Sequence, residues 1–97
     1  MAERASSAPS RELLLAVHVF PGEYMVKAFG PGTDEFRAAV HAAAAAVVGA
    51  GSVRSTERST KSARRMCITL LLAVETVDDV TAVYHRIAEV DGLLMLL

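Results

Sequence analysis

The sequence predicts an α+β protein with one antiparallel sheet and two helices, and three observations support this prediction. Residues 66–74 alternate apolar side chains with a period of two and contain no Gly, Pro or Asn, which is typical of a central strand. Residues 34–48 and 77–90 instead repeat apolar residues at helical spacing. The chain has 97 residues and an apolar content of 53%, which is enough for one hydrophobic core.

The chain begins with a segment rich in Ala, Ser and Pro, so residues 1–12 are predicted to be a disordered tail and residues 13–97 a single domain. Residues 13–20 are apolar apart from His18, and the periodicity of residues 11–20 does not separate a short helical turn from an extended lead-in. Residues 24–29 alternate again and end at a Gly-Pro-Gly turn, which predicts the first strand.

The first helix is predicted to begin after Thr33, a plausible N-cap, with Asp34 and Glu35 in its first turn. Gly49 and Gly51 end it. Its buried face is expected to contain Phe36, Val40, Ala43 and Val47.

The second half of the chain contains a polar stretch at 52–60, which fits an exposed edge strand, then a turn at 61–65 and the central strand. Thr76 and Asp79 have the spacing of a capping box, and 93–97 are predicted to be the last strand. The buried stripe of the second helix is predicted to be Val80, Val83, Tyr84, Ile87 and Val90. This order predicts a ferredoxin-like βαββαβ sandwich with two helices on one face of a four-stranded antiparallel sheet, its first and third strands central.

Several short motifs resemble those of the YbeD-like family of small bacterial proteins, over about residues 18–97. They are Phe20-Pro21, Tyr24-x-x-Lys27, Gly30, Phe36 with Val40, Val80-x-x-x-Tyr84 and the closing Leu93-Leu94-Met95-Leu96-Leu97. The resemblance implies a ferredoxin-like, ACT-like domain of unknown function whose genes neighbour lipoate biosynthesis. The family's Ser-Ser, Gly and Tyr between the second and third strands are represented here at best by Ser59-Thr60, Ala63 and Arg65.

Composition and residue content argue against several classes of function. The net charge of −1 argues for no polyanionic partner, and the single Cys67 excludes an internal disulfide and a cysteine-built metal site. The three histidines are scattered, so we expect no metal, no cofactor and no catalytic residues. The third strand lacks aromatic residues for stacking bases, so no nucleic-acid partner is expected. No signal peptide or membrane span is found, so we expect a cytoplasmic protein without membrane contact.

The Gly30-Pro31-Gly32-Thr33 segment is the first candidate site. It resembles the turn that lines an effector pocket in ACT domains, which implies a ligand site here. The alternative is a tight turn with glycine at positive φ.

A basic cluster is the second candidate site. Five of the ten basic residues lie around one hairpin: Arg54, Arg58, Lys61, Arg64 and Arg65. They predict either a charged edge strand protected from pairing or a contact site for an anionic ligand or partner.

The uncovered sheet face is the third candidate. Its predicted side chains are mostly apolar, which is typical of a contact surface. We expect a homodimer that self-associates through Phe29, Leu71, Leu94 and Leu96. The alternative is that residues 13–20 fold back and cover this face.

The resulting function is a non-enzymatic regulatory or interaction module that binds a protein partner or a small metabolite. The alternative is a small enzyme or accessory subunit in acyl or lipoate metabolism.

Overall fold

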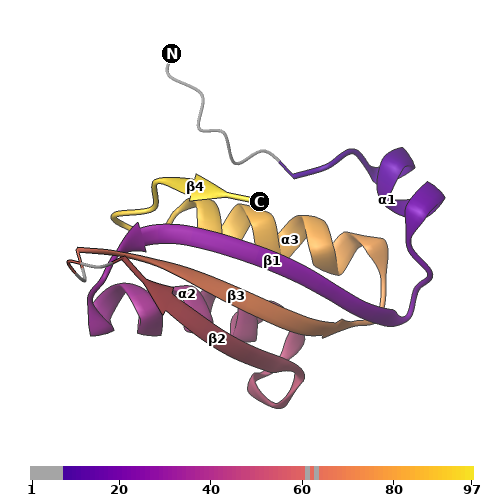
Figure 1. Cartoon of the computed structure of the whole chain (residues 1–97). Coiled ribbons are helices and arrows are strands. Elements are labelled where there is room, and N and C mark those ends of the chain that lie inside the picture. The colour runs from indigo at the N-terminus through magenta and orange to yellow at the C-terminus, as the bar shows by residue number, and fades with distance from the viewer. Residues whose placement is uncertain (1–7, 61, 63) are drawn as a thin grey trace.

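The computed structural model describes residues 8–60, 62 and 64–97, which form a sheet with helices on one side (Figure 1). Four antiparallel strands pair in the order β2-β3-β1-β4, with β1 and β3 in the middle. The elements are α1 (Arg11–Val17), β1 (Gly22–Pro31), α2 (Asp34–Val48), the 3₁₀ turn η1 (Ala50–Ser52), β2 (Val53–Ser59), β3 (Arg65–Val74), α3 (Val77–Ala88) and β4 (Met95–Leu96). The predicted ferredoxin-like fold is confirmed.

The central strand β3 pairs with β1 along its whole length and with β2 from Ser59 opposite Met66 to Val53 opposite Leu72. Alternate side chains of β3 point toward α2 and α3 and are at most 7% exposed: Met66, Ile68, Leu70, Leu72 and Val74. Val26 of β1 is fully buried beside them. The predicted inner thread is therefore confirmed, and β2 is the predicted edge strand.

Both long helices begin where side chains cap their first N–H groups. Thr33 Oγ1 accepts a hydrogen bond from Phe36 N at 3.1 Å, and Thr76 and Asp79 form the predicted capping box. The predicted stripe of α3 is buried throughout, whereas α2 buries Ala44 rather than Ala43. Phe36 and Val40 are buried as predicted, and Ala44 continues their four-residue spacing. Ala43 and Val47 are only partly buried against the core.

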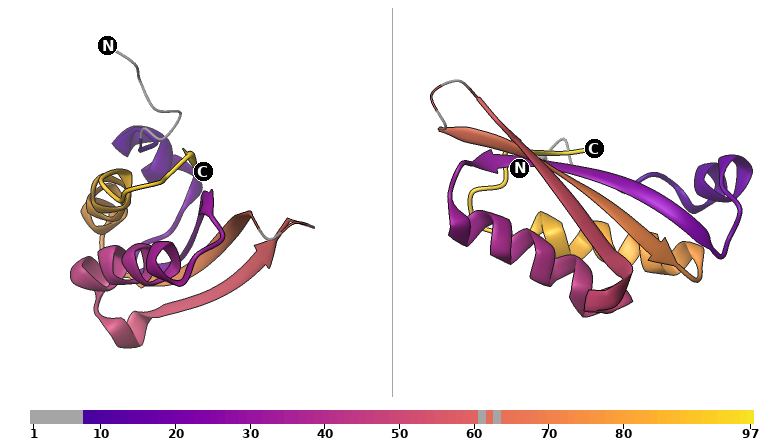
Figure 2. Two further views of the ribbon diagram at one scale, coloured as in Figure 1. Left: turned by 90° about the vertical axis from the view of Figure 1, so that its left-hand side faces the viewer. Right: turned by 60° about the horizontal axis from the view of Figure 1, so that its bottom comes forward.

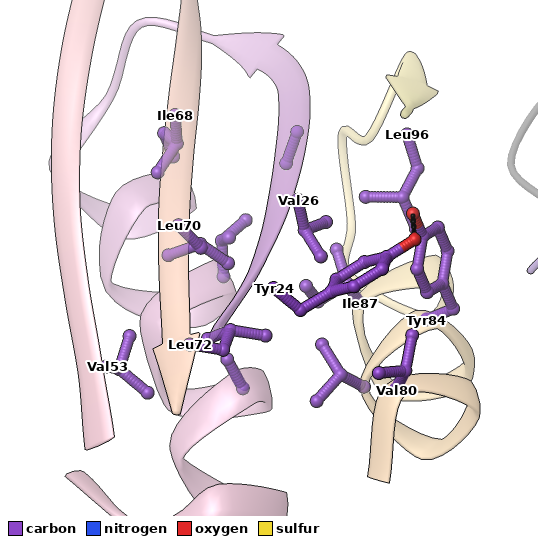
Figure 3. Close-up of a cluster of buried hydrophobic side chains, with 14 of the residues drawn as sticks. Tyr24, Val26, Val53, Ile68, Leu70, Leu72, Val80, Tyr84, Ile87 and Leu96 are labelled. Carbon is purple, nitrogen blue, oxygen red and sulfur yellow. Dashed lines mark hydrogen bonds between the residues drawn. The ribbon is translucent and has the colours of Figure 1, made fainter. Parts of the chain in front are cut away.

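A tyrosine pair closes the core between β1 and α3. The hydroxyl oxygens of Tyr24 and Tyr84 lie 3.2 Å apart, and both side chains are less than 10% exposed (Figure 3). The His18 ring packs edge-on against Tyr24 with centroids 4.8 Å apart. Burial, and then the hydrogen bond to Tyr24, raises the pKa of the Tyr84 phenol.

The N-terminal part of the domain differs from the prediction. Arg11 and Glu12, predicted in the tail, form the first turn of α1, which Ser10 caps by accepting a hydrogen bond from Leu13 N at 3.1 Å. Residues 1–7 of the predicted tail lie outside the described residues. Leu14 is 1% exposed in the core, and Arg11 forms an ion pair with Asp78 of α3.

The position of α1 overturns one alternative for the open sheet face. The helix packs against α3 and extends the helix layer, as the left panel of Figure 2 shows. Residues 13–20 therefore do not cover the opposite face of the sheet. The physical reason is that Leu14 anchors α1 in the helix layer, and Leu13, Leu15 and Val17 remain more than half exposed.

The last strand is shorter than predicted, and its register places Leu96 on the other face. β4 contains only Met95 and Leu96, which lie opposite Phe29 and Ala28, and the flanking Leu94 and Leu97 form backbone hydrogen bonds with β1. Leu96 therefore points into the core with Ala28 and is 2% exposed. The prediction that Leu96 lies on the open face is wrong, because the register with β1 places Met95 there instead.

Candidate functional site

The sheet face that α2 and α3 leave uncovered carries the candidate site (Figure 2). Cys67 of β3 lies opposite Phe29 of β1 and Arg58 of β2, and Phe29 lies opposite Met95 of β4. Directly paired residues point to the same face of a sheet. These four side chains therefore form one row across all four strands, apolar in the middle and cationic at the β2 edge.

This face has an excess of positive charge. The register places four cations and one carboxylate on it: Lys27, Arg54, Arg58, Arg65 and Glu23. Glu23 Oε2 accepts a hydrogen bond from Arg54 Nη2 at 3.1 Å. The other three cations form no ion pair with any described carboxylate. The open face is therefore cationic although the whole chain has a net charge of −1.

The basic cluster predicted from the sequence is divided by the structure. Arg54 is neutralised by Glu23, and Lys61 lies outside the described residues. Arg64 precedes β3, and its carbonyl accepts a hydrogen bond from Gly32 N at 3.0 Å. Only Arg58 and Arg65 line the same cavity.

Glu57, which interrupts the cluster in sequence, does not neutralise these arginines. It lies opposite Ile68 and so belongs to the other face, where its Oε1 accepts a hydrogen bond from Arg37 Nη1 at 2.9 Å. This contact, aided by Asp34, raises the pKa of the Arg37 guanidinium. The alternation of β2 thus directs the Glu57 side chain toward Arg37 and not toward Arg58.

A cavity of about 350 Å³ opens at the hairpin end of this face. Phe29 and Cys67 are half-buried in its lining, and Leu94 and Met95 are 56% and 40% exposed. The full lining comprises Phe29, Gly30, Arg58, Ser59, Thr60, Arg65, Met66, Cys67, Leu94 and Met95. The cavity therefore has a mostly apolar lining that also includes two arginines.

The Gly30–Thr33 segment has structural roles. Both Gly30 and Pro31 belong to β1, and neither Gly30 nor Gly32 has positive φ; the glycines that do are Gly49 and Gly92. A Cβ at Gly30 would lie 2.3 Å from the Phe36 ring, so glycine is required there by close packing. Of the four residues, only Gly30 also lines the cavity at the hairpin end. A ligand site at this segment stays a prediction.

The predicted self-association set is only partly on the open face. Phe29 and Leu71 are half-buried there, and Leu94 is exposed at the β4 edge. Met25 is 54% exposed and lies opposite Leu71, so it adds to the apolar part of the face. Lys27 lies opposite Thr69 in the centre of the face.

No group of three or more metal-ligating side chains occurs among the described residues. Nor is any helix in the described part of the chain both long and apolar enough to cross a membrane.

Comparison with known proteins adds a family to this description. One family, described as a protein of unknown function (DUF493), matches residues 16–97. The chain belongs to this family. The YbeD-like proteins are members, so the resemblance found in the sequence is confirmed. No curated protein and no solved structure is significantly similar to the chain.

Two features of the family member were missed by sequence reasoning. Tyr24 and Tyr84 belong to separate motifs, and only the fold shows that their hydroxyl groups meet. Met95 was not assigned to the open face, because the pattern of five apolar residues at 93–97 does not fix its own register. Only the pairing of Met95 with Phe29 shows that the Met95 side chain lies on the open face.

Proposed function

We propose that this family member is a non-enzymatic binding module whose open sheet face recognises a small anionic metabolite with an apolar part. The observation that carries the proposal is the set of three cations without described ion partners, beside an apolar row that none of the described helices covers. An anion would form charge-assisted hydrogen bonds with these groups. The apolar part of the ligand would remove Phe29 and its neighbours from water. Regulation by such binding would agree with the ACT-like resemblance.

An amide spectrum of the ¹⁵N-labelled protein tests this proposal. The protein is titrated with the low-molecular-weight fraction of an extract of its native cells and, separately, with the macromolecular fraction. We expect the first fraction to shift Lys27, Cys67 and Thr69 on the open face. Lys27→Gln should weaken the response, whereas Arg86→Gln, which removes an exposed cation from α3, should leave it unchanged. Shifts confined to α2 and α3 would contradict the proposal, and a response to the macromolecular fraction alone would replace the metabolite by a protein partner.

Self-association through the same face is the second candidate, because four exposed apolar side chains lie along its β1–β4 side. Met25, Leu94, Met95 and Leu97 are each at least 40% exposed. A two-fold contact would bury this area but would also bring two copies of Lys27 toward one interface. Sedimentation of the wild type and of Leu71→Asp at high micromolar concentration tests it. A dimer that becomes a monomer in the variant supports this candidate, and a monomeric wild type removes it.

The enzymatic alternative, in acyl or lipoate metabolism, makes a different prediction. Three side chains that could take part in acid–base or nucleophilic chemistry lie apart: Cys67 on the open face, and Asp78 and His85 on α3 across the sheet. Loss of an assayed activity on replacing any one of them would favour an enzyme. If replacing the three changes no assayed activity, these side chains carry no catalysis and the enzymatic alternative loses its candidate residues.

A further inference from the structure

We infer that the cavity at the hairpin end of the open face binds a carboxylate attached to a compact apolar group. This inference rests on the proposed function and adds the class of ligand and the residues that would contact it. The six lining residues that decide the chemistry are Phe29, Arg58, Arg65, Cys67, Leu94 and Met95.

The two arginines specify the anionic part. Arg58 is paired with Cys67, so Arg65, two positions before Cys67, is its diagonal neighbour on the same face. Diagonal neighbours lie within reach of long side chains, and like charges at such distances repel. Neither guanidinium group has a described carboxylate partner. A ligand carboxylate between them removes the repulsion and accepts hydrogen bonds from both groups.

The remainder of the cavity specifies the apolar part. Phe29 and Cys67 are half-buried, and Leu94 and Met95 present exposed side chains beside them. A volume of about 350 Å³ is at the lower end of the range of small-molecule sites. It suits a short chain carrying an aromatic ring, and burial of the ring against Phe29 and Met95 supplies the apolar contact.

A phosphate group is a poorer match than a carboxylate. Phosphate sites commonly use several N–H groups at a helix N-terminus or in a glycine-rich loop. Here the lining is carried mainly by strands, whose backbone groups are engaged in the ladders of β1, β2 and β3. The donors of the cavity are therefore mainly two arginine side chains, whose forks hold carboxylate and phosphate groups alike. We prefer a carboxylate because the described lining adds no helix N-terminus to these forks.

Three commercially available probes separate these contributions. They are 4-phenylbutyrate, its neutral isostere 4-phenylbutanamide, and butyrate, which keeps the carboxylate and lacks the ring. We expect 4-phenylbutyrate to shift the amides of Phe29, Cys67 and Met95, and to bind at least about tenfold more tightly than either of the other probes. Equal affinity of the amide and the carboxylate would overturn the inference.

Matched variants locate the contact. Arg58→Gln and Arg65→Gln should each weaken 4-phenylbutyrate about tenfold. Arg54→Gln removes a cation from the same face of β2 that is already bound to Glu23, so it should change the affinity less than about twofold. An intact amide spectrum verifies that each variant is folded. Equal losses in Arg54→Gln and Arg58→Gln would show that only the general charge of the face matters, and would overturn the assignment of the cavity.

Cys67 gives an independent footprint, because it is the only cysteine and it lines the cavity. Saturating 4-phenylbutyrate should slow its alkylation by the neutral reagent iodoacetamide, whereas 4-phenylbutanamide at the same concentration should not. Failure of this inference is distinct from failure of the proposed function. If the open face responds to the metabolite fraction of the extract but 4-phenylbutyrate neither shifts Cys67 nor protects it, the binding module stands and the ligand class is wrong.

Discussion

On one face of β3, Ile68, Leu70 and Leu72 are fully buried under the helices, whereas on the other face Cys67, Thr69 and Leu71 are only half-buried. These residues alternate along one strand and share the same backbone pairing. On the inner face, the buried hydroxyl groups of Tyr24 and Tyr84 are partners of each other. On the open face, three of the four cations lack a described carboxylate partner. This difference supports the proposal that the open face makes a contact with a ligand.

The largest expected effect compares two neighbouring leucines. Leu70→Ala should lower the free energy of unfolding by about 2–5 kcal/mol, because Leu70 is fully buried and its loss leaves a cavity. Leu71→Ala should cost less than about 1 kcal/mol, since Leu71 is only half-buried. Urea unfolding followed by circular dichroism measures both. Similar losses at the two positions would mean that something covers the open face even in the isolated protein.

The next comparison concerns glycines at opposite ends of α2. Gly30→Ala places a methyl group against the Phe36 ring, so we expect a loss of about 1–3 kcal/mol from overpacking. Gly51→Ala is the control, because nothing lies within 4 Å of a Cβ at that position, and its effect should stay within about 0.5 kcal/mol. If Gly30→Ala were also neutral, the packing of Phe36 under the end of β1 would be looser than described.

The tyrosine pair tests whether the inner face is satisfied. Tyr84→Phe leaves the Tyr24 hydroxyl without its partner and should cost about 1–3 kcal/mol of unfolding free energy. The double variant Tyr24→Phe, Tyr84→Phe removes both polar groups and should be closer to the wild type than Tyr84→Phe alone. A double variant whose loss equals the sum of the two single losses would indicate that the hydroxyl groups do not interact.

The same tyrosine pair should make the free energy of unfolding depend on pH in the alkaline range. The folded protein holds the pKa of Tyr84 above its ordinary value of 10.0. The unfolded chain therefore releases this proton first, and stability that is fully present below pH 10 is lost as the pH rises above it. One phenol contributes a slope of about 1.4 kcal/mol for each pH unit. Urea unfolding at a series of pH values should show a steeper decline for the wild type than for Tyr84→Phe, and parallel declines would contradict this cause.

The elements predicted correctly from the sequence are those fixed by local chemistry. Thr33 and the pair Thr76 and Asp79 cap helices through hydrogen bonds that span only three residues. Likewise the alternation of β3 identifies its buried side without knowledge of the neighbouring strands. Helix capping and strand alternation each involve residues only a few positions apart, so both can be predicted from the sequence.

The wrong predictions concern features that depend on residues far away in the sequence. Leu96 was placed on the wrong face because a two-residue strand takes its register from β1, not from its own pattern. The place of α1 depends on Leu14 and on an ion pair that joins Arg11 to Asp78. The candidate site is of the same kind. Arg54 and Arg58 are equivalent in sequence, and only the fold shows that Glu23 reaches one of them.

The smallest expected effect compares Arg54, which has a carboxylate partner, with Arg58, which has none among the described residues. Arg54→Gln removes an exposed ion pair and should lower the free energy of unfolding by at most about 1 kcal/mol. Arg58→Gln should leave the stability unchanged or raise it by a few tenths of a kcal/mol, roughly the size of a cross-strand like-charge term, because it relieves repulsion with Arg65. The opposite signs should be clearest at low ionic strength and should converge at 1 M salt, where the Debye length falls to about 3 Å. Thermal unfolding of both variants at two salt concentrations measures this. A destabilised Arg58→Gln would show that Arg58 already has a partner within the folded chain. The proposal that the open face binds an anionic ligand would then be contradicted.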